Sequence, residues 1–294
     1  MKDRAEHHYI ETNGVTLHVV AAGPEDGPLV LLLHGFPDFW YGWRHQIPAL
    51  AAAGYRVLAP DQRGYNLSEK PVGAAAYGIE TLAADIVGLI HAVGRDRAFV
   101  VGHDWGGGVA WELGCSHPEC VERLAILNSP YPAVLLDSIR RSPAQLRKSW
   151  YILFFQIPAL PEFLLSLGNW RLASRSLSQS SRPGAFTDLD MRRYRRAWSR
   201  PRAMTSMLNW YRAAIRHQPA PPADPRVHLP TMLIWGAQDQ FLGRDLAVQS
   251  LSYCDDIRLE VIDDATHWVQ HEEPERVNRL LLDFLRSPAP LVDE

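Results

Sequence analysis

An aspartate in a glycine-flanked turn is the first residue of this sequence whose setting indicates chemistry. The apolar run RAFVV leads directly into GHDWGGGVAWEL, so Asp104 stands where a strand turns into a helix. Gly102 and Gly106 lie two residues on either side of it, the spacing of a nucleophile elbow, where a tight turn leaves no room for side chains. An aspartate before a helix can also act only as its N-cap, but a cap needs no flanking glycines. We therefore interpret Asp104 as a nucleophile.

A carboxylate nucleophile predicts a different reaction from a serine. A serine elbow forms an acyl enzyme from an ester or an amide. An aspartate instead attacks a saturated carbon that carries a leaving group, and it becomes an alkyl ester. Water must then attack the carbonyl of that ester to release the product, so a general base is needed for the second step.

Two later residues could activate this water. Asp239 follows the apolar run TMLIW, and His267 follows the run IRLEVI. Open α/β sheets place their sites at the carboxyl ends of strands, and acid and histidine follow the nucleophile in elbow hydrolases. Either residue alone could be a turn residue, and Asp263 and Asp264 could simply shape the histidine loop. The alternative acid position, after ERLAIL, holds Asn128, which leaves Asp239 as the expected partner of His267.

Two backbone N–H groups are expected to form an oxyanion hole. The loop HGFPDFWYGWR follows the apolar run LVLLL, and its amide at Phe36 could point at the developing negative charge. The amide of Trp105 would be the second donor, because the first N–H groups of a helix have no intrahelical acceptor. His34 and His103, close to these donors, are expected to be structural histidines.

The surrounding pattern predicts the elements that position these residues. Short runs rich in Val, Ile and Leu alternate with helical patterns, as in parallel sheets that are covered on both faces. The clearest helix covers residues 79–93 and ends at Gly94. Two further helices are predicted at 244–252 and 274–285. The predicted strands are residues 15–21, 29–33, 56–59, 98–101, 123–127, 231–235 and 257–262.

The alternation stops after Asn128 and resumes near residue 227. Between them lies a segment with helical patterns, cut into short pieces by prolines at 143, 158, 161, 183 and 201, and closed by the proline-rich stretch 219–225. This character suits a lid over a core. We therefore divide the chain into a first core part (1–130), a helical lid (131–226) and a second core part (227–294).

Composition indicates a globular chain, and its charge is unevenly distributed. The 294 residues are 47% hydrophobic with a net charge of -3. Residues 138–216, however, carry fifteen Lys or Arg against Glu162, Asp188 and Asp190. We interpret this excess as a solvated outer face and expect no nucleic-acid partner, with attraction of anionic partners or lipid surfaces as the alternative.

The cysteines and the N-terminus favour a cytoplasmic protein. Cys115, Cys120 and Cys254 are odd in number and lack framework spacing, which suits free thiols. Cys115, His117 and Cys120 could bind a metal, but a buried thiol explains them better, and no metal is expected. The N-terminal residues lack the apolar stretch of a secretory signal, and prolines interrupt the most apolar run, so no transmembrane span is expected.

Five separated motifs together resemble the soluble epoxide hydrolases of the α/β-hydrolase fold. They are HGFPDFWYGWR, DQRGYNLSEKP, GHDWGG, WGAQDQF and DATHW, and the likeness runs over nearly the whole chain. The resemblance implies a mostly parallel eight-stranded sheet with helices on both faces and a helical lid insertion. It also implies an epoxide and water as reactants, with no cofactor.

The same resemblance assigns two tyrosines in the lid. SWYILFFQIPALPE and LNWYRAA are similar to the family segments that each contribute a catalytic tyrosine, which implies this role for Tyr151 and Tyr211. Without the resemblance, both residues would be interpreted as core aromatics. An opening epoxide leaves as a basic alkoxide, which suits hydroxyl donors. We further expect the substrate pocket to include Phe36, Pro37, Trp105 and Trp268.

Two other functions stay open at this point. Haloalkane or haloacid dehalogenases use the same aspartate, and Trp105 occupies the position that holds the halide in the first of these families. Some dehalogenases carry asparagine where this chain has Phe36. Fluoroacetate dehalogenases have a motif similar to GHDR, with arginine where this chain has Trp105. Both differences favour epoxides as substrates. A ligand receptor on the same fold is the other alternative, and a homodimer is compatible with all three.

Overall fold

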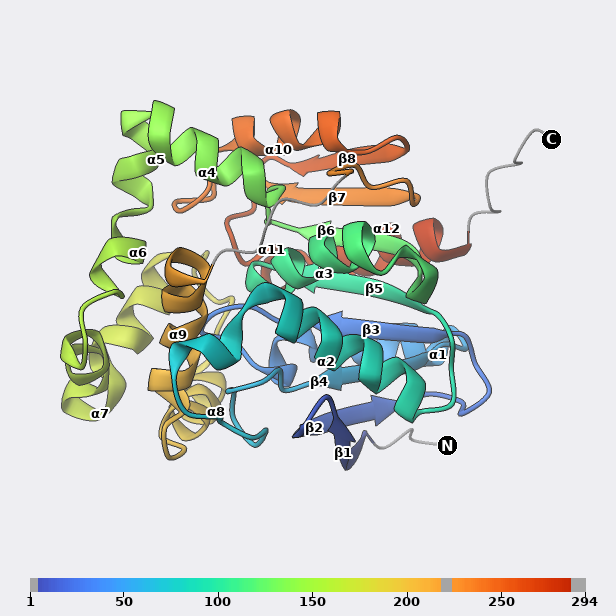
Figure 1. The fold of residues 1–294 in the computed structure, drawn as a ribbon, viewed down its shortest axis with the longest axis horizontal. Coiled ribbons are helices and arrows are strands. Elements are labelled where there is room, and N and C mark those ends of the chain that lie inside the picture. Colours follow the sequence, from blue (N-terminus) through green and yellow to red (C-terminus); the bar gives the residue numbers. More distant parts are fainter. Residues whose placement is uncertain (1–4, 218–223, 287–294) are drawn as a thin grey trace.

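The computed structural model describes residues 5–217 and 224–286 and contains an eight-stranded sheet (Figure 1). The strand order is β1-β2-β4-β3-β5-β6-β7-β8. The pairs β1·β2 and β2·β4 are antiparallel, and the strands from β4 to β8 run parallel, so the predicted mostly parallel sheet is confirmed. The strands are β1 (Glu6–Thr12), β2 (Val15–Ala22), β3 (Leu29–Leu33), β4 (Arg56–Pro60), β5 (Ala98–His103), β6 (Val121–Leu127), β7 (Thr231–Gly236) and β8 (Ile257–Ile262).

Helices cover both faces of this sheet, as the apolar strands require. Leu31 and Leu33 of β3 pack into one core cluster with α2, whereas Val30 and Leu32 pack into a second cluster with α1 and α12. The core helices are α1 (Gln46–Ala52), α2 (Ile79–Ala92), α3 (Trp105–Ser116), α10 (Arg244–Ser250), α11 (Val269–Glu272) and α12 (Pro274–Arg286), and short 3-10 turns span Trp40–Trp43, Ala74–Tyr77, Pro118–Cys120 and Leu251–Tyr253.

Only helices lie between β6 and β7 in the described residues, and they gather at the end of the sheet toward which the parallel strands point (Figure 1). Pro132 and Pro143 stand at the start of two of them, where proline is tolerated. The proline-rich stretch predicted to close the lid lies largely outside the described residues. These lid helices are α4 (Pro132–Arg141), α5 (Pro143–Lys148), α6 (Trp150–Phe154), α7 (Leu160–Gln179), α8 (Asp188–Trp198) and α9 (Ala203–Arg216).

Buried hydrogen bonds hold the lid helices on the core. From α8, the hydroxyl of Tyr194 donates to Asp38 at 2.8 Å, and the indole N–H of Trp198 donates to the carbonyl of Pro37 at 2.7 Å. From α9, the indole of Trp210 donates to a core carbonyl at 3.0 Å. These bonds fix the lid against the loops that follow β3 and β4. Within residues 5–217 and 224–286, no helix has both the length and the apolar character needed to cross a membrane.

Candidate active site

Asp104 lies in the strained turn between β5 and α3. Its φ of 51° and ψ of -120° are rare for a residue with a side chain, and its carboxylate makes no capping hydrogen bond to α3. A Cβ at Gly102 would collide with the carbonyl of Gly106, and one at Gly106 would collide with the carbonyl of Leu33. The glycines therefore allow the turn, and the turn presents the Asp104 side chain rather than using it as a cap.

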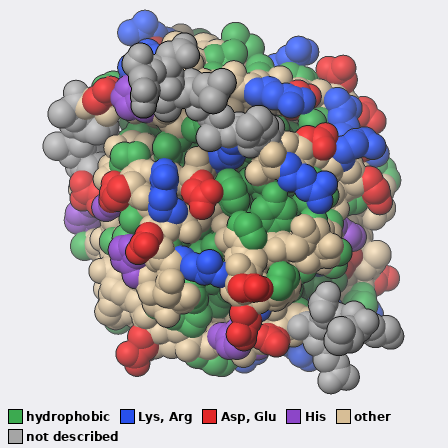
Figure 2. All heavy atoms as spheres, turned by 90° about the vertical axis from the view of Figure 1, so that its right-hand side faces the viewer, with side chains coloured by type: hydrophobic (Ala, Val, Ile, Leu, Met, Phe, Trp, Pro, Cys, Tyr) green, Lys and Arg blue, Asp and Glu red, His purple; other side chains and the backbone are tan. Residues whose placement is uncertain are grey.

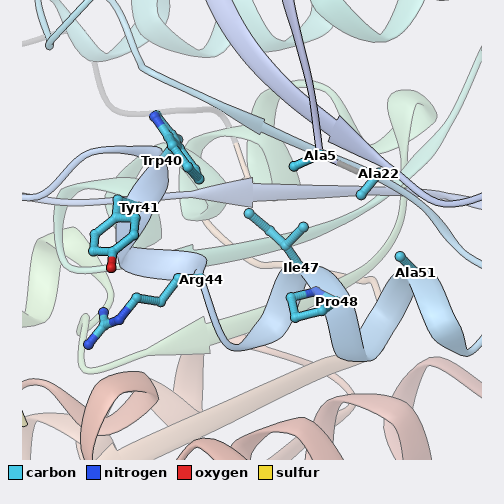
Figure 3. A pocket seen from close by; sticks show the side chains of 8 residues that line it. All are labelled: Ala5, Ala22, Trp40, Tyr41, Arg44, Ile47, Pro48 and Ala51. Atoms are coloured by element: carbon cyan, nitrogen blue, oxygen red, sulfur yellow. The ribbon is translucent and has the colours of Figure 1, made fainter. Parts of the chain in front are cut away.

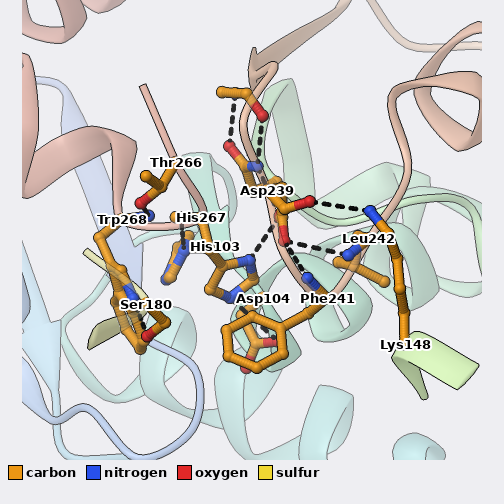
Figure 4. Close-up of polar contacts among 12 residues, drawn as sticks. His103, Asp104, Lys148, Ser180, Asp239, Phe241, Leu242, Thr266, His267 and Trp268 are labelled. Atoms are coloured by element: carbon orange, nitrogen blue, oxygen red, sulfur yellow. Dashed lines mark hydrogen bonds and ion pairs between the residues drawn. The ribbon is translucent and has the colours of Figure 1, made fainter. Parts of the chain in front are cut away.

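Asp104, His267 and Asp239 converge although they follow three different strands (Figure 4). His267 Nδ1 lies 2.7 Å from Asp239 Oδ2, and His267 Nε2 lies 3.6 Å from Asp104 Oδ2. The Asp104 side chain keeps 17% of its surface exposed, against 4% for His267 and none for Asp239. Asp104 is thus the member that a substrate could reach, with the histidine and then the second aspartate placed behind it.

The carboxylate of Asp239 is held by three further groups. Oδ1 accepts the backbone N–H groups of Phe241 at 2.7 Å and Leu242 at 3.0 Å, and Oδ2 accepts the side-chain amide of Asn128 at 2.8 Å. Burial opposes ionisation, but the charge of His267 and these hydrogen bonds hold the pKa of Asp239 below its ordinary value. Asn128 occupies the alternative acid position, where the sequence showed only that a carboxylate is absent. In the structure its side-chain amide helps to hold the carboxylate of Asp239.

Lid residues support the same acid loop. The buried side chain of Gln145 on α5 donates to the carbonyl of Phe241 at 2.8 Å and accepts the N–H of Gly243 at 3.2 Å. The ammonium group of Lys148 donates to the carbonyl of Asp239 at 3.0 Å (Figure 4). No motif in the sequence marks these two residues, because their role depends on how α5 packs against the loop after β7.

Two negative charges determine the protonation of His267. Burial alone lowers its pKa, but the charges and hydrogen bonds of Asp239 and Asp104 outweigh burial and raise the pKa of His267 to about 10. Burial likewise opposes the charge on Asp104, yet the hydrogen bond to His267, the histidine charges and the Phe36 amide lower the pKa of Asp104. The resting pair is therefore an aspartate anion beside a protonated imidazole.

This electrostatic coupling is testable without an activity assay. Replacing Asp104 with Asn keeps the shape of the side chain but removes one of the two anions, so the pKa of His267 should fall from about 10. A histidine titration followed by NMR measures the change. The control is Asp263→Asn, which removes an exposed carboxylate four residues before His267 and should leave the titration where it was. An unchanged His267 titration in Asp104→Asn would contradict the coupling.

Both expected oxyanion donors lie beside Asp104. The backbone N–H of Phe36 donates to Asp104 Oδ1 at 2.7 Å. Trp105 is the first residue of α3, where helix geometry leaves the N–H free of an intrahelical acceptor. The Phe36 amide thus points at the Asp104 carboxyl group, where negative charge would develop if its carbon were attacked, and a role for the Trp105 amide stays a prediction.

Tyr151 of α6 and Tyr211 of α9 meet above this group. Their ring centroids are 6.0 Å apart, and the ring of Tyr211 lies 5.0 Å from that of Trp105 and 5.3 Å from that of Phe36. Burial and then the negative charge of Asp104 raise the pKa of both tyrosines. Both are consequently neutral hydroxyl donors at neutral pH.

Two phenylalanines that the sequence analysis did not single out complete an aromatic cluster. Phe155 lies 5.6 Å from Tyr151 and 5.0 Å from Tyr211 between ring centroids. Phe241 lies 5.8 Å from Tyr151 and 5.4 Å from His267. Their positions in the sequence could have indicated both residues, because Phe155 stands one helical turn after Tyr151 and Phe241 closes the motif WGAQDQF.

The other predicted residues have mixed surroundings. Trp268 packs 5.1 Å from His267, but it is buried and its indole N–H donates to Ser180 at 3.0 Å (Figure 4). Pro37 lies beside Phe36, with its carbonyl bound to the lid. Their place in the pocket stays a prediction. His103 Nε2 donates to the carbonyl of His267 at 2.8 Å, while burial and the charge of His267 lower the pKa of His103 to about 4.

A surface hollow of about 390 Å³ lies elsewhere, at the start of α1 (Figure 3). Its polar side chains are already engaged, since the hydroxyl of Tyr41 donates to Asp190 at 2.7 Å and Arg44 lies 2.6 Å from a ring nitrogen of His271. None of its eight lining residues is a serine, cysteine, histidine or carboxylate. The hollow therefore lacks the carboxylate and histidine that the predicted chemistry requires, whereas the group around Asp104 has both.

Comparison with known proteins identifies the family of this chain. The model of the alpha/beta hydrolase fold family matches residues 28–274. The AB hydrolase superfamily protein YfhM of Bacillus subtilis is 47% identical over 97% of this chain and 99% of its own length. Epoxide hydrolase A of Mycobacterium tuberculosis is 37% identical over 94% of this chain and 96% of its own length.

A solved structure extends the likeness to three dimensions. The crystal structure of a mutant epoxide hydrolase from Bacillus megaterium superposes with a TM-score of 0.88 at 32% identity, over 95% of this chain and all of that one. The resemblance inferred from the five motifs is thereby confirmed along nearly the full length. The chain belongs to the α/β-hydrolase fold family and, within it, to the epoxide hydrolases.

Proposed function

We propose that this enzyme converts an epoxide into a vicinal diol through a covalent ester on Asp104. The observation that carries the mechanism is the convergence of a reachable carboxylate, a histidine-aspartate pair and two tyrosine rings from different elements. Epoxide and water are the reactants. No residue in this group needs a cofactor for the steps below.

In the first step, a carboxylate oxygen of Asp104 attacks an epoxide carbon and the bond from that carbon to the ring oxygen breaks. The ring oxygen becomes an alkoxide and takes a proton from Tyr151 or Tyr211, which hold it by hydrogen bonds. The product of this step is a hydroxyalkyl ester. The tyrosines suit the step because their raised pKa values keep the proton in place until the alkoxide forms.

In the second step, neutral His267 removes a proton from water, and the resulting hydroxide attacks the ester carbonyl carbon of Asp104. The N–H groups of Phe36 and Trp105 stabilise the oxyanion of the tetrahedral intermediate. Its collapse breaks the bond from the carboxyl carbon to the alkyl oxygen, the leaving oxygen takes the proton held by His267, and the carboxylate and the diol result. Asp239 orients His267 through Nδ1, so that Nε2 faces Asp104 and the water.

The loss of charge on Asp104 links the two steps. While Asp104 is an anion, it raises the pKa of His267 and of both tyrosines. Ester formation neutralises Asp104, so all three pKa values should fall together. The tyrosines thereby become stronger acids as the alkoxide forms. His267 then passes its proton through solvent to the tyrosinate left by the first step, which restores the tyrosine and leaves the neutral base that the second step needs.

Isotope labelling tests the covalent route. Under single-turnover conditions in water enriched in heavy oxygen, the new oxygen should enter Asp104, because water attacks the carboxyl carbon and the original carboxylate oxygen leaves with the diol. Mass spectrometry of the peptide that contains Asp104 measures the label. Label confined to the diol of the first turnover would contradict the ester, and diol formation is measured separately, so the activity and its route are tested apart.

The division into a first core part, a lid at 131–226 and a second core part is retained as part of this proposal. It is supported by the helices that separate β6 from β7 and by the origin of both tyrosines in that segment. A cytoplasmic location is supported by the three cysteines, all of which are unpaired.

A further inference from the structure

The outer side of helices α6 and α7 exposes large apolar side chains. Trp150 and Leu153 on α6 are each 61% exposed, and Phe163 on α7 is 59% exposed. Of the fourteen exposed large hydrophobic side chains among the described residues, ten lie between positions 136 and 189. Such concentration marks an interaction surface, because monomeric proteins rarely leave large apolar patches open. We define the lid patch as Trp150, Leu153, Ile157, Leu160, Phe163 and Leu167.

The members of the lid patch follow one another along one outer edge of the molecule. Trp150 and Leu153 are three residues apart on α6, which places them on one side of this helix, and Ile157 lies just beyond its end. Leu160 and Phe163 have the same spacing on the first part of α7, and Leu167 stands where its helical geometry breaks. Figure 1 shows α6 and α7 at the edge that lies away from the sheet.

The exposure does not come from a poorly packed helix. The opposite side of α6 carries Tyr151, whose ring packs 5.6 Å from Phe155 and 5.8 Å from Phe241. The chain after α6 is also tied down, since the side-chain amide of Gln156 donates to the carbonyl of Tyr211 at 3.1 Å. Helix α6 is thus apolar on both sides, one against the active site and the other open.

Cations flank the lid patch on both sides in sequence. Arg140 and Arg147 are exposed on the two helices before it, and Arg171 and Arg175 are exposed after it on α7. The acidic residue inside it, Glu162, is neutralised by Arg212 at 2.8 Å. On the side of the molecule away from these helices, acidic and basic side chains are interspersed (Figure 2). The positive surplus therefore accompanies the exposed apolar side chains.

We propose that the lid patch docks on the surface of an anionic lipid bilayer. Exposed Trp, Phe and Leu side chains can enter the boundary between headgroups and acyl chains, while flanking arginines contact lipid phosphates. A second copy of the chain is a poorer occupant, because a symmetric contact through this face would place two sets of arginines against each other. This docking is independent of the proposed hydrolase mechanism.

Docking in this way would also place α6 at the bilayer. Because Tyr151 lies on the inner side of the same short helix, the active site would be about one helix diameter, roughly 10 Å, from the lipid surface. Apolar epoxides concentrate in bilayers. The enzyme would then meet such substrates where they accumulate.

Vesicle flotation with the purified full chain tests the proposal. We expect the chain to float with vesicles of phosphatidylglycerol and phosphatidylcholine at low salt, with an apparent partition constant about tenfold or more above that for phosphatidylcholine alone, and to be released by high salt. Trp150→Ser with Phe163→Ser should reduce anionic binding about tenfold or more. The matched control, Tyr9→Ser with Val72→Ser, removes side chains that are 61% and 84% exposed on the core and should bind like the unchanged chain.

Circular dichroism and diol formation from a water-soluble epoxide show that each variant is folded. The proposal is overturned if the unchanged chain ignores anionic vesicles, or if the Trp150→Ser, Phe163→Ser variant binds them as well as the control variant does. Analytical ultracentrifugation adds a third decisive outcome. A dimer that depends on the lid patch, in a chain that does not bind vesicles, would assign this face to a second copy.

Discussion

A His267→Gln variant should open one epoxide per active site and then stop. Glutamine cannot act as a general base, whereas the Asp104 carboxylate, the proposed nucleophile of the first step, remains. Turnover should fall by about 10²–10⁴-fold, the usual contribution of a general base, with the alkyl ester left on the protein. Intact-protein mass spectrometry should detect an adduct equal in mass to the substrate, and peptide mapping should place it on Asp104.

The double variant Asp104→Asn, His267→Gln is the control for this experiment. It carries the same change at the base but no nucleophile, so it should form no adduct under the same conditions. Steady turnover by His267→Gln without an adduct would show that water opens the epoxide directly. An adduct on another residue would move the nucleophile away from Asp104. Both outcomes leave diol formation by the unchanged enzyme intact and contradict only the route.

The fold was predictable where a single strong pattern determines an element. The apolar residues spaced through 79–93 predicted α2 to within one residue, and Gly94, with φ of 74°, follows its end. Strand β1 was not among the predicted ranges. Its sequence EHHYIET has one aliphatic residue, because β1 is an exposed edge strand whose role is to pair with β2.

The candidate site was predictable only where the strands of the sheet position its residues. Asp104, Asp239 and His267 each follow a buried parallel strand, so the sheet alone brings them to one edge. Tyr151 and Tyr211 came from family resemblance, since local patterns do not say which lid residues face the core. Gln145 was missed for the same reason. Its partners lie about a hundred residues away on the acid loop, and only the packed structure brings them together.

Replacing Tyr151 or Tyr211 with Phe should slow epoxide opening by about 10²–10⁴-fold, because an alkoxide that receives no proton is a poor leaving group. The effect should appear in the alkylation rate measured by rapid quench, and much less in hydrolysis of the ester. Phenylalanine keeps the ring contacts of the aromatic cluster, so the folded state should be preserved. The loss can then be attributed to the hydroxyl group.

Tyr65→Phe is the matched control for these variants. Tyr65 is buried and its hydroxyl has no hydrogen-bond partner among the described residues, so the same loss of one oxygen should leave the alkylation rate nearly unchanged. An alkyl halide provides the second comparison, because a halide ion leaves without a proton. If both tyrosine variants opened epoxides at the original rate and the unchanged chain released halide, the proposal that Asp104 displaces an epoxide oxygen would be wrong. If only epoxide opening fails, the two hydroxyls of the lid determine which substrate the aspartate can attack.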